Sequence, residues 1–326
     1  MSTINKVLRA TDAVPGPDDE FAAGVIEGLS RPHKSLPCRF FYDARGSELF
    51  EQITGLPEYY PTRTEVAILE SQMSNIVADI CDGAVLVEFG SGSSRKTEIL
   101  LSSLPQLRAY VPIDVSASAL SDAKQRLLER FPSLDIRLVI GDFSNPVAFP
   151  SDLTDAPKTG FFPGSTIGNL NALAAGRLLS TMRDVLSPGG RLIVGVDLKK
   201  DARKLVCAYN DAAGVTAAFN LNLLTRINRE LEGSFDLDGF RHKAIYDPRE
   251  GRVEMHLVSV RDQMVSVLGQ WFKFFAGETI HTENSYKYSV HQFQELARSA
   301  GWNPAQVWID DDNLFSVHEL ISGSRP

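Results

Sequence analysis

The sequence predicts an α/β fold with a mainly parallel sheet, together with a second, smaller α+β lobe. Short apolar segments alternate with helical segments between residues 84 and 196, as expected for right-handed strand–helix–strand units. A glycine turn directly follows the first of these apolar segments. Beyond about residue 235, apolar and polar residues alternate one by one and turn signals separate the segments, which predicts antiparallel strands.

The elements of the parallel sheet follow from apolar runs and helical spacing. We expect five strands, at residues 84–89, 109–114 and 135–140, from residue 160 onwards, and at residues 192–196. Pro112 is an irregularity in the second of these strands. Helices are predicted after the glycine turn up to Leu104, from Ser116 to Phe131, and through Leu178 and Met182 to a break at 187–190.

The remaining elements are predicted from turns and caps. Strands at 244–246 and 252–258 flank the turn at 247–251, and residues 265–275 form a further strand candidate. Ser289 and Gln292 have the spacing of a capping box before a helix that Gly301 closes. The first 60 or so residues indicate mostly helix and loop.

Composition excludes several classes of protein. The 326 residues contain 33 Lys and Arg against 41 Asp and Glu, a formal charge of −8, which argues against nucleic-acid and anionic-membrane partners. No run approaches the ~20 apolar residues that span a bilayer, and the N-terminus has no apolar signal region. We therefore expect a soluble, cytoplasmic monomer. The separated Cys38, Cys81 and Cys207 are expected to be buried, reduced thiols.

Three successive strand ends carry residues suited to a nucleoside. Gly90 and Gly92 allow a sharp turn, Asp114 could accept both ribose hydroxyls, and Asp142 with Phe143 could hold an adenine. Arg95 stands where a dinucleotide fingerprint needs its third glycine, which disfavours a nicotinamide-dependent oxidoreductase. The pattern resembles the S-adenosylmethionine site of class I methyltransferases, whose cofactor has no phosphates.

Five longer segments of the sequence carry a more specific resemblance. They are residues 41–43, 56–65, 164–170, 209–220 and 282–288. These blocks resemble the histidine Nα-methyltransferases of ergothioneine biosynthesis, and the resemblance runs from about residue 16 to about residue 320. It implies a class I, Rossmann-like domain at 61–200. Residues 1–60 and 201–326 would then build the substrate-binding lobe, with the last segment returning to the sheet.

The resemblance also implies roles for individual residues. The substrate carboxylate would be held by Tyr59, Asn169 and Tyr209, the amino end by Gly164 and Tyr42, and the imidazole by Glu283 and Ser285. Tyr42 and Asn169 would lie at the reacting nitrogen. The cofactor would be bound by Gly90, Lys96, Asp114, Asp142 and Phe143. From the residues alone, alternation along a strand places Glu283 and Ser285 on one face.

The expected activity is transfer of methyl groups from S-adenosyl-L-methionine to the α-amino group of L-histidine, giving the trimethyl betaine hercynine. The sulfonium is a good leaving group, so no metal is expected, and the six histidines show no metal-ligand spacing along the chain. One alternative is an Nα-methyltransferase for tryptophan or a related amine. Another is a non-catalytic binding protein on a methyltransferase scaffold, although Asp114 and the glycine turn are both retained.

Overall fold

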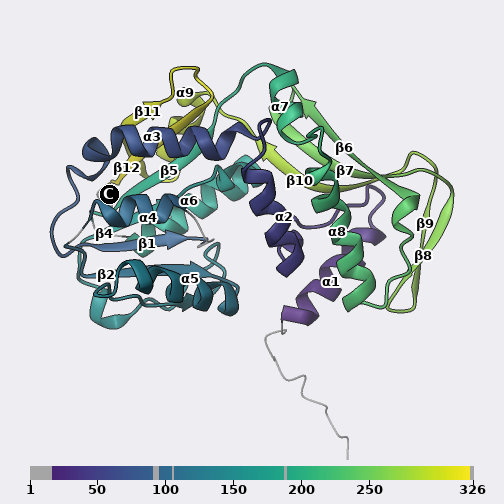
Figure 1. Ribbon diagram of the computed structural model, residues 1–326, viewed down its shortest axis with the longest axis horizontal. Helices are drawn as coiled ribbons and strands as arrows, with labels where there is room; N and C mark the ends of the chain where they lie inside the picture. The colour runs from purple at the N-terminus through teal and green to yellow at the C-terminus, as the bar shows by residue number, and fades with distance from the viewer. Residues whose placement is uncertain (1–16, 91–94, 105, 187–188, 324–326) are drawn as a thin grey trace, which may run out of the picture.

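The computed structural model describes residues 17–90, 95–104, 106–186 and 189–323 (Figure 1). Its largest sheet has seven strands in the order β11-β12-β5-β4-β1-β2-β3. Their bounds are β1 Val85–Phe89, β2 Ala109–Asp114, β3 Val139–Ile140, β4 Lys158–Phe162, β5 Arg191–Asp197, β11 Trp302–Ile309 and β12 Phe315–Ser322. The strands β1 to β5 pair in parallel, whereas β12 runs antiparallel to β5 and β11.

Helices cover both faces of this sheet because its strands are apolar on both faces. One face packs against α3 Tyr60–Val77, α4 Arg95–Ser102 and α5 Ala117–Arg130. The other packs against α6 Ala172–Leu186 and α9 Val290–Ser299. Within β1, Val85 and Val87 pack toward α6 and α9, whereas Leu86 packs toward α3, α4 and α5. The strand is therefore buried on both faces.

The strand order shows where a ligand would bind. The chain proceeds from β1 to β2 and β3 in one direction, and the next strands, β4 and β5, lie on the other side of β1. Ligands of such sheets bind beyond the carboxyl ends of the strands at this reversal. Gly90 follows β1 and Gly164 lies just after β4, so the predicted glycine turn and the predicted substrate contact both stand at the reversal.

The second lobe combines the two ends of the chain. Its antiparallel sheet has the order β10-β7-β6, and β8 and β9 form a separate hairpin. The strands are β6 Phe240–Asp247, β7 Arg252–Ser259, β8 Gln263–Val267, β9 Gln270–Phe274 and β10 Thr279–Tyr286. The helices are α1 Pro17–Ser30, α2 Ala44–Thr54, α7 Ala202–Ala208 and α8 Val215–Glu230. Phe21, Leu49, Phe219 and Met255 belong to one shared core, although they come from distant parts of the chain.

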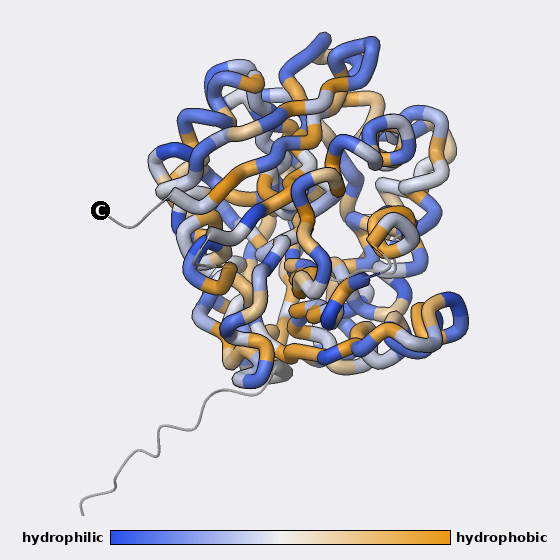
Figure 2. Tube along the Cα trace, turned by 90° about the vertical axis from the view of Figure 1, so that its left-hand side faces the viewer, coloured by the Kyte–Doolittle hydropathy of each residue, from blue (hydrophilic) through white to orange (hydrophobic). Residues whose placement is uncertain are grey.

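Short 3-10 helices complete the chain, at η1 Cys38–Phe41, η2 Ser151–Leu153, η3 Thr166–Asn169 and η4 Leu237–Gly239. In Figure 2, hydrophobic stretches run through the interior of the molecule and hydrophilic ones mark many of the outer loops. No helix in the described part of the chain is long and apolar enough to cross a membrane.

Most predicted elements are confirmed, including the capping box at Ser289 and the positive φ of Gly301. The single strand predicted at 265–275 is wrong. Leu268 and Gly269 both have positive φ and form a two-residue turn, so this segment folds as the β8–β9 hairpin. The predicted turn residues Gly92 and 187–188, and the segment 1–16, lie outside the described residues.

The strand predicted at 135–140 is shorter than expected. Tyr110 of β2 exchanges backbone hydrogen bonds with Asp135 and Arg137, but regular pairing resumes only at Val139. The next residue of β2 that faces this neighbour is Pro112, which has no N–H to donate. The missing donor explains why only Val139–Ile140 remains as β3.

The prediction for the cysteines is partly wrong. All three are free thiols, but Cys81 and Cys207 are exposed and only Cys38 is partly buried. Cys207 lies on α7 two residues after the buried Leu205, and this helical spacing turns it away from the core. Cys81 lies in the exposed connection before β1.

Candidate active site

The carboxyl end of β1 turns sharply at Gly90. Its φ is +78°, and a Cβ at this position would lie 3.4 Å from the ring of Phe143. The Phe143 ring contacts Phe89 and Phe162 edge-on, at centroid distances of 6.4 and 5.9 Å. The turn and the aromatic ring predicted for the cofactor are therefore neighbours.

The two carboxylates predicted for the nucleoside differ in their surroundings. Asp114 ends β2, its Oδ1 accepts the Ser116 N–H at 2.9 Å, and burial raises its pKa. Asp142 is exposed and caps its own turn, accepting from the Ser144 N–H and the Asn145 amide, both at 2.8 Å. An adenine would have to share the Asp142 oxygens with these donors.

Lys96, which is predicted to bind the cofactor, is buried and linked through Glu65 to Gly164, which is predicted to bind the substrate. Its Nζ lies 2.5 Å from Oε2 of Glu65, and the same carboxylate accepts the Gly164 N–H at 2.9 Å. Lys96 was predicted as a cofactor contact, whereas no pattern in the sequence singled out Glu65. Because both charges are buried, removal of either partner would leave an uncompensated charge.

The turn after β4 places the next residues. Gly164 has a φ of +84° and Ser165 one of +57°, and the Ser165 hydroxyl accepts the Asp197 N–H at 2.9 Å. The helix η3 then packs against β10 so closely that a Cβ at Gly168 would lie 2.8 Å from the Tyr286 carbonyl oxygen. Asn169 is the last residue of η3, the 3-10 helix that contacts both β5 and β10.

Aromatic rings connect the three predicted tyrosines. Tyr42 contacts Phe50 edge-on at 5.7 Å, Phe50 contacts Tyr59 at 6.3 Å, and Tyr59 contacts Tyr209 at 6.1 Å. The Tyr209 hydroxyl lies 2.7 Å from Oγ of Ser285. Phe50 was not predicted, because nothing in the sequence distinguishes it from the other phenylalanines among the 18 in the chain.

The predicted pairing of Glu283 and Ser285 on one face agrees with the strand register. They stand opposite Met255 and Val253 of β7, which alternate along that strand. The register shifts at Thr282, so a bulge places His281 on the opposite face. Burial raises the pKa of Glu283 to about 7, although the nearby Lys287 ammonium lowers it.

A buried group of charges that the sequence did not indicate lies beside Ser285. Lys287 and Lys200 contact the two oxygens of Asp197 at 2.6 and 2.5 Å, and the Tyr60 hydroxyl donates to the same carboxylate at 2.9 Å. Burial opposes ionisation of Asp197, but the two ammonium groups outweigh it and lower its pKa. Two lysines around one aspartate leave an excess of positive charge next to Tyr209.

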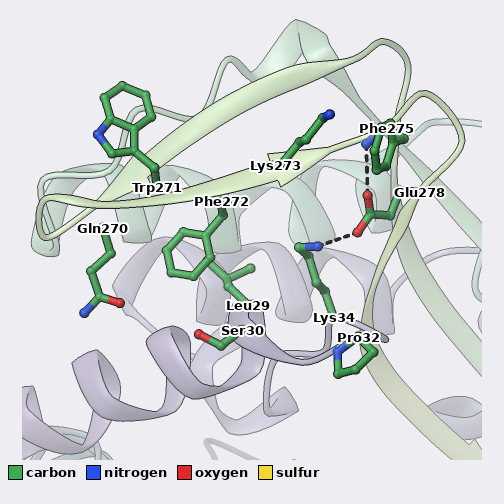
Figure 3. A pocket seen from close by; sticks show the side chains of 10 residues that line it. All are labelled: Leu29, Ser30, Pro32, Lys34, Gln270, Trp271, Phe272, Lys273, Phe275 and Glu278. Atoms are coloured by element: carbon green, nitrogen blue, oxygen red, sulfur yellow. Dashed lines mark hydrogen bonds and ion pairs between the residues drawn. The ribbon is translucent and has the colours of Figure 1, made fainter.

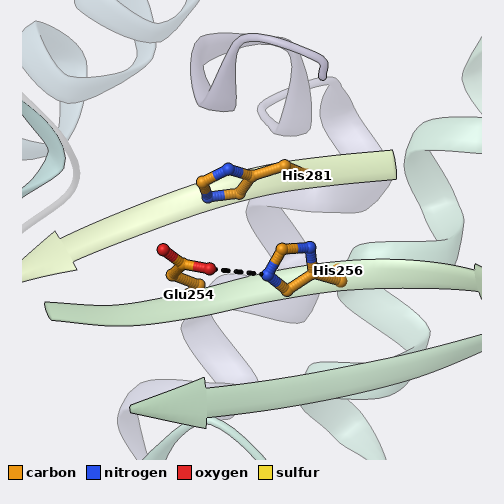
Figure 4. Close-up of side chains that lie close together, drawn as sticks. All are labelled: Glu254, His256 and His281. Atoms are coloured by element: carbon orange, nitrogen blue, oxygen red, sulfur yellow. Dashed lines mark hydrogen bonds and ion pairs between the residues drawn. The ribbon is translucent and has the colours of Figure 1, made fainter. Parts of the chain in front are cut away.

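A second charged cluster lies on the opposite face of the β10-β7-β6 sheet (Figure 4). Potential metal-ligating atoms of Glu254, His256 and His281 lie within 4.8 Å of one another. In the structure, Glu254 contacts Arg252 at 2.6 Å and His256 at 2.9 Å, while His281 Nε2 bonds to the Glu283 carbonyl oxygen at 2.9 Å. Sequence spacing could not reveal this cluster, because the register of two strands assembles it.

A surface pocket of about 740 Å³ lies elsewhere on the second lobe (Figure 3). Leu29 and Lys34 line one side, Trp271 and Phe272 of β9 line the other, and Lys34 forms an ion pair with Glu278. None of the twelve residues predicted for cofactor or substrate lines this pocket.

Known proteins of similar sequence identify the family of this chain. Residues 21–322 match the family of S-adenosylmethionine-dependent, histidine-specific methyltransferases. The chain belongs to this family. Histidine N-alpha-methyltransferases of Mycobacterium tuberculosis and Mycolicibacterium smegmatis are 43% and 44% identical to it, over 90% of this chain and 92% of each relative. Ergothioneine biosynthesis protein 1 of Neurospora crassa is 31% identical over 92% of this chain and 35% of the fungal protein.

Proposed function

We propose that this methyltransferase transfers three methyl groups from S-adenosyl-L-methionine to the α-amino nitrogen of L-histidine. The product would be hercynine, and the reaction would be the first step of ergothioneine biosynthesis. Family membership supports the reaction class, and the names of the mycobacterial and fungal relatives support the substrate and the pathway. The observation that carries the choice of substrate is the pair of polar groups, Glu283 and Ser285, on one face of β10 beside three tyrosines.

In this proposal, each end of histidine meets a group of matching chemistry. Glu283 and Ser285 bind the two ring nitrogens, since a carboxylate and a hydroxyl can both hydrogen-bond to imidazole. Tyr59, Asn169 and Tyr209 bind the carboxylate, and the excess positive charge of Lys287 and Lys200 favours an anion there. In this orientation, the α-amino group of histidine lies near Gly164 and Tyr42.

On the cofactor side, the sulfonium nucleoside would lie across the ends of β1 and β2. Gly90 gives room for close approach, Asp114 accepts the ribose hydroxyls, and Asp142 and Phe143 contact the adenine. Lys96 would pair with the methionyl carboxylate while retaining Glu65. The Glu65 contact to the Gly164 N–H would then couple cofactor binding to the turn that holds the amino end.

The chemistry requires position and a free lone pair. A neutral amine attacks the methyl group in line with the departing sulfur, and the protein holds the two atoms at reacting distance. Tyr42 is 47% exposed, but desolvation at its hydroxyl and the Glu283 carboxylate both raise its pKa. It therefore acts as a neutral phenol that orders water to take the amine proton. The third methylation gives a quaternary nitrogen that cannot react again, so trimethylation is the end point.

The aromatic rings suit the charge of this product. Tyr42, Phe50 and Tyr59 surround the amino end with π faces and edges, and such faces attract quaternary ammonium groups. Successive intermediates can remain bound by the same carboxylate and ring contacts between methyl transfers.

Mass spectrometry tests the proposal directly. The protein would be incubated with S-adenosylmethionine and a panel of amino acids that includes histidine, tryptophan and phenylalanine. We expect products of one, two and three added methyl groups from histidine, all on the α-nitrogen by fragmentation. Methyl groups on the imidazole ring, or a clear preference for tryptophan, would show that the proposed substrate orientation or identity is wrong.

A further inference from the structure

Lys287 is the least expected residue near the candidate active site. Lys287 directly follows β10 and its side chain is completely buried. Its Nζ contacts three acceptors. They are Asp197 Oδ2 at 2.6 Å, the Tyr209 hydroxyl at 2.9 Å and Ser285 Oγ at 2.7 Å. A lysine ammonium has three hydrogens to donate and cannot accept. Both hydroxyls therefore accept one hydrogen bond from Lys287.

The contact between the two hydroxyls uses one further hydrogen. Tyr209 and Ser285 lie 2.7 Å apart, so one of them donates to the other. Each hydroxyl has a single hydrogen. After the contact between them is made, only one of these two hydrogens is left to donate to a ligand.

This count restricts how histidine can bind, if the proposed function holds. A carboxylate only accepts, so Tyr209 must use its hydrogen to contact the substrate carboxylate. Ser285 then donates to Tyr209 and has no hydrogen left for the ring. It can only accept, and the ring nitrogen that it contacts must carry a hydrogen.

We propose that Lys287 is a positioning residue that makes Ser285 a hydrogen-bond acceptor, so that the substrate ring and Glu283 together bind one additional proton. With one ring N–H directed at Ser285, a neutral imidazole would turn a bare nitrogen toward a bare carboxylate. Two lone pairs facing each other repel, and a proton between them removes the repulsion. The bound pair is then an imidazolium beside a carboxylate, or an imidazole beside a carboxylic acid.

Burial makes Glu283 the group that titrates near neutrality among the charged and titratable side chains around it. Titratable and charged side chains that act on it come from η1 and its end, from the start of α3, from the end of α7 and from the end of β10. They are Cys38, Tyr42, Tyr59, Tyr209 and Lys287. Burial raises the pKa of the Cys38 thiol to about 12 and raises the pKa values of the three tyrosines. His281 lies on the other face of the sheet and touches only the Glu283 backbone.

Titration calorimetry of the trimethyl betaine measures this proton. The betaine is the right probe because its quaternary nitrogen does not titrate. Any proton taken up on binding must therefore go to its imidazole or to the protein. The protein, saturated with S-adenosylhomocysteine, would be titrated at pH 8 in two buffers of different ionisation enthalpy. With pKa values of about 7 for Glu283 and about 6.5 for the ring, we expect uptake of roughly 0.9 proton per betaine. If Ser285 instead donates to the ring nitrogen, the proton uptake should be about zero, and this result would overturn the inference.

Variants assign the uptake to Lys287. Lys287→Met leaves Asp197 with Lys200 and Tyr60. It removes the ammonium that holds the Tyr209 and Ser285 oxygens together, so Ser285 can turn away from Tyr209 and donate to the ring, and the uptake should fall to less than half. Ser285→Ala, a smaller change, should abolish it. In Glu283→Gln, the amide can donate to the bare ring nitrogen, so uptake should again be near zero. Uptake that persists in Lys287→Met would overturn the role of Lys287.

The affinity for S-adenosylhomocysteine separates a failure of this inference from a failure of the proposed function. Wild-type protein that binds S-adenosylhomocysteine but not the betaine would contradict the proposed substrate. Wild-type protein that binds the betaine without proton uptake would leave the proposed substrate intact and overturn only the inference. A variant is compared only if its affinity for S-adenosylhomocysteine is unchanged, which shows that its cofactor site is folded.

Discussion

Replacing Glu283 with glutamine should stabilise the protein above neutral pH. The amide keeps the shape of the carboxyl group but cannot ionise. Burial raises the pKa of Glu283 from 4.5 to about 7, so the folded state binds this proton more tightly than the unfolded state. The stability that this group contributes is complete below pH 4.5 and is lost as the pH rises toward 7.

The expected size follows from the shift in pKa. A difference of about 2.5 pKa units corresponds to about 3 kcal/mol of unfolding free energy. Urea titrations of wild type and Glu283→Gln, without ligands, should therefore give equal stabilities near pH 4.5. The variant should be more stable by about 3 kcal/mol at pH 8. Other groups titrate in both proteins, so their contributions cancel in the difference.

Glu254→Gln is a matched control on the same sheet, because it should change the free energy of unfolding in the opposite direction. Burial alone would raise the pKa of Glu254, but hydrogen bonds from Arg252 and His256 outweigh burial and lower it. Glutamine at this position should therefore destabilise the protein at pH 8, and the deficit should shrink as the pH falls through the pKa of Glu254. A difference between Glu283→Gln and wild type that stays constant from pH 5 to pH 8 would refute the reasoning.

Three further predictions concern binding and catalysis. Asp114→Ala should weaken S-adenosylhomocysteine binding roughly 10- to 150-fold, the usual effect of losing a charged hydrogen-bonding group, and calorimetry showing unchanged affinity would remove Asp114 from the cofactor site. Glu283→Ala should reduce kcat/KM for histidine at least about 10-fold while affecting phenylalanine much less. A constant ratio of the two efficiencies would mean that Glu283 does not select the side chain. Dialysis against a chelator should leave the rate unchanged, because the sulfonium needs no metal; loss of activity restored by a divalent cation would direct attention to Glu254, His256 and His281.

The sequence was most informative where local patterns determine structure. The apolar runs that became β1, β2 and β5 and the capping box of α9 needed no knowledge of distant residues. The glycine turn and the acidic strand ends followed from the topology of a parallel sheet. Their placement at the reversal of strand order follows from the same rule.

The parts that could not be predicted depend on partners far away in the chain. Lys287 would be expected at the surface, because lysine is rarely buried unless paired, and its partner Asp197 lies 90 residues earlier. The histidine cluster depends on strand register and on the bulge at Thr282. The strand predicted at 265–275 failed for a different reason, because Leu268 gives no local sign that it will adopt a positive φ.

The shared core of the second lobe has a consequence for folding during synthesis. The helices α1 and α2 leave the ribosome before the strands β7 and β10 that they help to enclose, which are made some 200 residues later. At about 5–20 residues per second, apolar residues such as Phe21 and Leu49 wait roughly 10 to 40 seconds for their partners. The β1–β5 region can collapse during this interval. We therefore expect the N-terminal helices to be the segment on which a nascent-chain chaperone acts, and the substrate lobe to be the last part to fold.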